Sequence, residues 1–213
     1  MNICFYIFIS LFATISLLQL FFNYRKIELG RIITKPLCLL TLSLSFIFFN
    51  VNLYLVYVSC FVAMAGDILL LFKKRKILFI LGGTLFTIEH ILNFILISRV
   101  FSSFQTYLYI IILPSIFLFG LFSLLKKNRK KLFFCAYSYF GFQFANILLA
   151  LIGLIIYKNM FLLMVIGGYL FFAFSDFLIL YKLIYRDFKN RSFYLILTYL
   201  IAQPTILFGV SLL

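Results

Sequence analysis

Runs of about twenty mostly apolar residues recur along the whole of this 213-residue chain, and about 20 such residues are what a helix needs to cross a bilayer. Hydrophobic residues make up 66% of the sequence and charged residues only 11%. A soluble domain must cover its surface with polar groups, which this composition does not provide. The sequence therefore predicts an integral membrane protein with a single transmembrane domain, residues 1–213.

The apolar runs and the charged residues between them predict an all-α, polytopic bundle of eight transmembrane helices. Each run is continuous and does not alternate between apolar and polar residues, which favours helices over the strands of a membrane barrel. The predicted spans are 3–22, 36–50, 53–72, 77–97, 104–125, 132–156, 160–181 and 192–212.

Basic residues fall almost entirely on alternate connections between these spans. Of the 19 Lys and Arg residues, only Arg99 and Lys158 lie in or beside the second, fourth or sixth connection. Cytoplasmic loops of membrane proteins carry the excess of Lys and Arg, so the odd-numbered connections are predicted to be cytoplasmic and both termini to lie on the outer side. This clustering between spans also accounts for the net charge of +14, and no nucleic-acid partner is predicted. The Phe-, Ile- and Lys-rich composition and short basic loops are typical of a bacterial inner membrane protein.

Two of the five acidic residues lie inside predicted spans, in similar contexts. The segments AMAGDILLLFKK and FAFSDFLILYK carry Asp67 and Asp176, each followed six residues later by a lysine. An ionised aspartate within a membrane costs a few kcal/mol, about 2.5–3.5 on insertion scales, and usually marks a functional site. The two spans run in the same direction, so the match raises the alternative of two parallel four-helix halves.

Other polar residues are expected at similar depths. Each aspartate lies about 9 Å inside the cytoplasmic boundary at 1.5 Å per residue. A shared cavity that opens toward the cytoplasm is predicted, with Lys35 and Pro36 opening the second span. The alternative interpretation of each of these polar side chains is a purely structural hydrogen bond between helices. The candidate binding residues are Lys35, His90, Asn146, Tyr199 and Gln203.

No cofactor or metal site is predicted. The chain has one histidine and no Cys/His cluster, which argues against zinc. A divalent site made only of the carboxylates of Asp67, Asp176 and Glu89 remains an alternative. Buried carboxylates are also used by proton- or sodium-coupled transporters, which is the main alternative to an enzyme.

Five segments together resemble the YhhN-like lysoplasmalogenase family. They are KPLCLL, AGDILL, FILGGTLFTIEHILN, GGYLFFAFSDFLIL and TYLIAQ, and they extend from the second predicted span to the eighth. The chain departs from the family pattern at Glu89, Asn93 and Pro204.

The resemblance implies an eight-helix enzyme that hydrolyses the vinyl ether bond of lysoplasmalogens, releasing a fatty aldehyde and a glycerophospho head group. It implies that Asp67 and Asp176 are the catalytic pair. The chemistry agrees, because protonating the alkene needs a carboxylic acid and stabilising the resulting oxocarbenium ion needs a carboxylate. Lys35, or alternatively a loop cation, is expected to bind the phosphate of a lysophospholipid drawn from the membrane, and His90, Asn146, Tyr199 and Gln203 are expected to orient water or the glycerol hydroxyl.

The predicted topology can be tested with reporters fused after Leu213. We expect a periplasmic reporter to be active and a cytoplasmic reporter to be inactive, because an even number of spans returns the chain to the side on which it began. Activity of the cytoplasmic reporter alone would contradict the eight-span prediction.

Overall fold

The computed structural model describes residues 3–49, 54–71, 76–101, 131–184 and 188–213. Their helices are α1 (Ile3–Arg25), α2 (Glu28–Phe49), α3 (Tyr54–Leu71), α4 (Lys76–Ser98), α6 (Lys131–Tyr157), α7 (Phe161–Ile184) and α8 (Arg191–Ser211). Each of these seven helices is long and apolar enough to cross a membrane, so the protein is an all-α integral membrane protein. The predicted span 104–125 lies outside the described residues.

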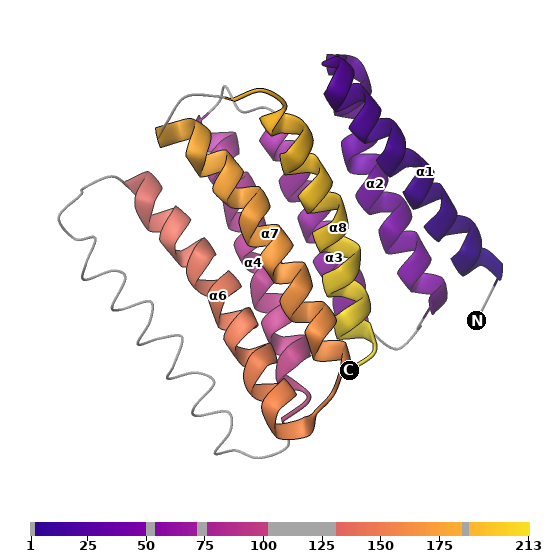
Figure 1. Cartoon of the computed structure of the whole chain (residues 1–213), viewed down its shortest axis with the longest axis vertical. Helices are drawn as coiled ribbons and strands as arrows, with labels where there is room; N and C mark the ends of the chain where they lie inside the picture. The colour runs from indigo at the N-terminus through magenta and orange to yellow at the C-terminus, as the bar shows by residue number, and fades with distance from the viewer. Residues whose placement is uncertain (1–2, 50–53, 72–75, 102–130, 185–187) are drawn as a thin grey trace.

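The helices form a bundle of two layers (Figure 1). Consecutive helices pack against each other in the pairs α1–α2, α2–α3, α3–α4, α6–α7 and α7–α8, and α8 also contacts α1, α3 and α4. In the view of Figure 1, α7 and α8 lie in front of α4 and α3. Helix α8 therefore packs against helices from the N-terminal part of the chain as well as against its neighbour α7.

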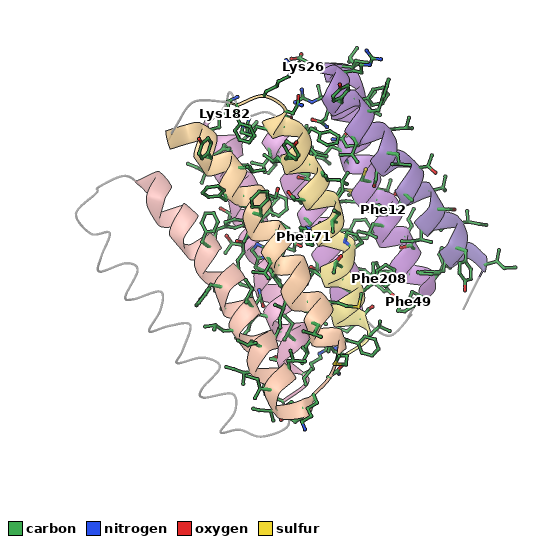
Figure 2. The ribbon with its side chains drawn as sticks, in the orientation of Figure 1. Phe12, Lys26, Phe49, Phe171, Lys182 and Phe208 are labelled. Atoms are coloured by element: carbon green, nitrogen blue, oxygen red, sulfur yellow. The ribbon has the colours of Figure 1, made fainter. Side chains whose placement is uncertain are left out.

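One end of the bundle gathers basic residues, and we call it the basic end. It contains the turn between α1 and α2 and the approach to α8, and Lys26 and Lys182 both lie there (Figure 2). The N and C ends of the chain both lie at the opposite end (Figure 1), where α6 also turns into α7 through Lys158, whose φ is positive. Among the described residues, Lys26 and Lys182 thus lie at one end and Lys158 at the other, which agrees with the predicted separation.

Helices α4 and α6 run parallel. Asn146 donates a hydrogen bond to the backbone carbonyl of His90, and the ring of Tyr157 packs against that of Phe101. In each pair the two residues are 56 positions apart in the sequence. Two contacts at different points along a pair of helices can have equal sequence separations only when the helices run in the same direction. The eight-span topology requires these two helices to run in the same direction.

Helix α2 begins earlier than predicted. Its first residue is Glu28 and Pro36 lies inside it, so the prediction that Lys35 and Pro36 open this helix is wrong. A tight turn with Lys26 at positive φ allows α2 to start directly after α1, and the carboxylate of Glu28 lies in the first turn, where it complements the helix dipole. Lys35 therefore lies within α2 and not at its first residue.

Helices α7 and α8 approach closely at glycines. A Cβ atom built on Gly168 would lie 2.9 Å from the backbone nitrogen of Ile206, and one on Gly209 would lie 3.0 Å from the backbone nitrogen of Val165. Small residues allow this kind of backbone approach between membrane helices. The contact fixes the depth of α8 against α7, and therefore the positions of the α8 side chains that reach the centre.

We expect Gly168→Ala to destabilise the protein by about 1–3 kcal/mol, because the new methyl group would collide with the backbone of α8. The matched control is Gly167→Ala, whose Cβ would meet no atom within 4 Å. Thermal unfolding of the purified variants in detergent measures the difference. Equal melting temperatures for the two variants would contradict this account of the helix contact.

Candidate functional site

Asp67 is held on α3 by one cation and one hydroxyl. The Nζ atom of Lys35 lies 2.5 Å from Oδ1 of Asp67, and the hydroxyl of Tyr199 donates a hydrogen bond of 2.7 Å to Oδ2. The ammonium group also lies over the Tyr199 ring, 5.6 Å from its centroid. Asp67 is only 1% exposed, so both carboxylate oxygens are satisfied by groups from α2 and α8.

Asp176 on α7 has a different set of partners. Its Oδ2 accepts a hydrogen bond of 2.6 Å from the hydroxyl of Tyr139 and one of 2.5 Å from the side-chain amide of Gln143. Both donors come from α6 and both are neutral. Among the described residues no cation forms a salt bridge with Asp176. The two aspartates therefore share burial but differ in the charge of their partners.

Aromatic rings fill the space between the two aspartates. The ring of Phe172 lies 5.6 Å from that of Tyr199 and 5.2 Å from that of His90, and the His90 ring lies 5.0 Å from that of Tyr139. Tyr199 and Tyr139 are the tyrosines that bind Asp67 and Asp176. The rings thus form a continuous row from one carboxylate to the other, which we call the aromatic wall, and His90 is its polar member.

A third carboxylate lies deeper in the bundle. Glu89 on α4 is 1% exposed, and its Oε1 accepts a hydrogen bond of 3.1 Å from the side-chain amide of Gln203 on α8. Nearby on α4, Asn93 accepts a hydrogen bond from Ser59 of α3.

The structure brings the predicted site residues together in the bundle interior. Lys35 forms the ion pair with Asp67, and its expected binding of phosphate stays a prediction. Tyr199 binds the same carboxylate. His90, Asn146 and Gln203 lie with Glu89 in the deeper group, where they are at most 1% exposed.

Sequence reasoning missed Tyr139 and Tyr169. Tyr139 is placed one helical turn before Gln143 on α6, so both reach Asp176 from the same face. A chain with 14 tyrosines and 31 phenylalanines gives no compositional sign of which aromatic residues point inward. The available signal was that Tyr139 lies four residues before Gln143, a polar residue inside a predicted span.

The alternative of a carboxylate-only metal site does not agree with the geometry. Among the described residues, no group of three or more His, Cys, Asp or Glu side chains converges closely enough to hold a metal ion. The ion pair of Asp67 with Lys35 gives the reason, since an ammonium group already occupies the position next to that carboxylate.

The surroundings of the two aspartates correspond in chain order. In each case the preceding helix supplies the partner: α2 gives Lys35 to Asp67, and α6 gives Gln143 to Asp176. The small residue directly before each aspartate contacts the following helix, α4 in one case and α8 in the other. This correspondence is what two parallel halves would produce, and that origin stays a prediction.

A comparison with protein-family models matched the YhhN family over residues 30–210. The match includes every helix described above except α1. Searches of curated proteins and of solved structures gave no match.

We expect Lys35→Met to destabilise the protein by about 3–5 kcal/mol, because it leaves the Asp67 carboxylate buried without its cation. The double variant Lys35→Met/Asp67→Asn should regain much of this loss, since it also removes the charge. Unfolding in mixed micelles measures the free energies, with Lys189→Met, at an exposed position, as the control. Additive losses in the double variant would show that the two side chains are not coupled.

Proposed function

We propose that this chain, which belongs to the YhhN family, is an intramembrane hydrolase that cleaves the vinyl ether bond of lysoplasmalogens. The products are a fatty aldehyde and a glycerophospho head group. The observation that carries the proposal is a pair of buried aspartates, one with a cation as its partner and the other with neutral donors only. Vinyl ether hydrolysis needs one carboxylate and one carboxylic acid, and needs no cofactor.

The different partners suggest different protonation states. The ammonium group of Lys35 compensates a negative charge on Asp67. Among the described residues, a charge on Asp176 would have hydrogen bonds from Tyr139 and Gln143 but no salt bridge of its own, and a charge without a paired cation inside a membrane bundle is costly. We therefore assign Asp176 as the general acid and Asp67 as the carboxylate.

In the first step, the Asp176 carboxyl proton is transferred to the alkene carbon distant from the ether oxygen. The electron pair of the double bond forms the new C–H bond, and the remaining cation is shared by the adjacent carbon and the ether oxygen. The Asp67 carboxylate stabilises this positive charge as it develops. The aromatic wall between the two aspartates supplies faces against which a planar alkene can lie.

In the second step, water adds to the oxocarbenium carbon and gives a proton to Asp67. The hemiacetal then collapses, with its hydroxyl proton returning to Asp176 while the glycerol oxygen leaves with the proton held by Asp67. Both aspartates regain their starting states, and one water is consumed in each turnover. No group outside the chain is required for the proton balance.

The substrate is a lysophospholipid that enters from the lipid between helices. The aspartates lie nearer the basic end than the deeper group does, so the head group is placed at that end and the alkyl chain in the apolar bundle. Basic residues at this end, such as Lys26 and Arg31, attract the phosphate. Lys35 acts as the charge partner of Asp67. We also retain the eight-span topology in a bacterial inner membrane, with both termini outside.

We expect Asp67→Asn and Asp176→Asn each to reduce fatty aldehyde release from a lysoplasmalogen by about 10²-fold or more, which is the usual contribution of an acid or base. The assay uses purified, detergent-solubilised protein with Glu28→Gln as the matched control, because Glu28 is an exposed carboxylate on α2. Normal activity in either aspartate variant would exclude the pair.

Isotopes identify the reaction itself. Turnover in D2O should place one deuterium on the carbon next to the aldehyde, and turnover in ¹⁸O-labelled water should place the label in the aldehyde oxygen. The aldehyde is reduced at once to the alcohol and analysed by mass spectrometry. A folded wild-type protein that releases no aldehyde would contradict the hydrolase, and ion-driven solute uptake in vesicles would then test the transporter alternative.

A further inference from the structure

Seven polar side chains form a group deeper in the bundle than the two aspartates, and we call it the deep polar cluster. Counted along α4 and α8 from the basic end at 1.5 Å per residue, Glu89 and Gln203 lie about 18–20 Å in, whereas Asp67 lies about 6 Å from the end of α3. The members come from α4, α6, α7 and α8. They are Glu89, His90, Asn93, Gln143, Asn146, Tyr169 and Gln203.

The cluster is buried but incompletely hydrogen-bonded. Each of the seven side chains is at most 2% exposed. Eight of their nitrogen and oxygen atoms form no hydrogen bond of good geometry among the described residues, although Tyr169 lies close to Asn93 and Asn146, and Glu89 to Asn93. Buried polar atoms in proteins are almost always hydrogen-bonded to protein or to ordered water, and eight exceptions in one place point to a polar ligand.

The unpartnered atoms include both donors and acceptors. Oε2 of Glu89 and the amide oxygens of Gln143, Asn146 and Gln203 accept, whereas the side-chain amide of Asn93 donates. Both ring nitrogens of His90 and the hydroxyl of Tyr169 are also unpartnered. Water both donates and accepts, so it matches this mixture, whereas an alkyl chain offers neither and a metal ion accepts only lone pairs.

The cluster reaches both aspartates. Gln143 belongs to it through its unpartnered oxygen, while the nitrogen of the same amide binds Asp176. Gln203 lies one helical turn beyond Tyr199 on α8, and Tyr199 binds Asp67. Water held beside Gln143 is therefore one side chain away from Asp176, and Gln203 extends the cluster along α8 toward the residue that binds Asp67.

We propose that the deep polar cluster binds water and supplies the molecule consumed in each turnover. This inference rests on the proposed hydrolase for its second part, because a lysolipid entering from the basic end covers the aspartates on that side. Water then has to reach the oxocarbenium carbon from the opposite, deeper side. The cluster is placed there, and the aromatic wall keeps the rest of the bundle apolar.

Radiolytic footprinting of the full chain in ¹⁸O-labelled water tests the binding site without any substrate. Hydroxyl radicals formed from bound water label the side chains beside it, even when these are buried. We expect ¹⁸O incorporation at His90 and Tyr169 well above that at Phe46, which is equally buried but packs against Phe208 in an apolar environment. Incorporation at His90 and Tyr169 no greater than at Phe46 would overturn the proposal.

The variant Tyr169→Phe tests the supply of water. It removes only the Tyr169 hydroxyl, which lies near Asn93 and Asn146 without a hydrogen bond of good geometry to either, so a purely structural role predicts a lower melting temperature with unchanged kcat. If the hydroxyl orients water, kcat should fall by about tenfold or more with little change in KM, as expected when a reacting group is misplaced. Labelling at His90 should fall with it. Tyr157→Phe, at an exposed tyrosine far from the cluster, is the matched control.

The outcomes separate the two proposals. Labelling at the cluster together with a lower kcat in Tyr169→Phe supports the inference. Labelling with an unchanged kcat overturns the supply role. Labelling in a folded wild-type protein that releases no aldehyde would leave the water site in place and contradict the hydrolase.

Discussion

The ion pair between Lys35 and Asp67 is the interaction on which the rest of the site depends. A carboxylate inside a membrane bundle is tolerated only when its charge is compensated. The ammonium group 2.5 Å away meets that need, and it joins α2 to α3. Tyr199 then adds α8 through the same carboxylate, so one charge fixes the relative positions of three helices.

The same constraint acts differently on Asp176. Its hydrogen-bond partners on α6 are neutral, so the charge of the partners, and not burial, separates the chemistry of two residues that look alike in sequence. This pattern of two titratable groups in unequal environments is how one site provides both an acid and a base. The difference comes from α2 and α6, which present a lysine in one case and a tyrosine with a glutamine in the other.

The polar groups of the bundle also follow an order by depth. The aspartates lie nearer the basic end, the aromatic wall separates them, and the deep polar cluster lies beyond. An alkyl chain needs apolar surroundings, whereas a water molecule needs hydrogen-bond partners. The order by depth provides these two kinds of surroundings in different parts of the bundle. The close glycine contact between α7 and α8 supports the arrangement by setting the depth at which Tyr199 and Gln203 enter the interior.

Sequence alone is enough to predict a helical membrane protein, its basic end, and the position of Asp67 and Asp176 inside the bundle. Those properties follow from composition, span length and the cost of charge in lipid, all of which can be read along one chain. The pairing of Lys35 with Asp67, the hydrogen bond from Tyr139 to Asp176, and the cluster that joins Glu89 to Gln203 become visible in the folded bundle. A helix presents side chains in every direction, so the partner of a buried group depends on which faces of separate helices meet, and that is set by packing between segments distant in sequence.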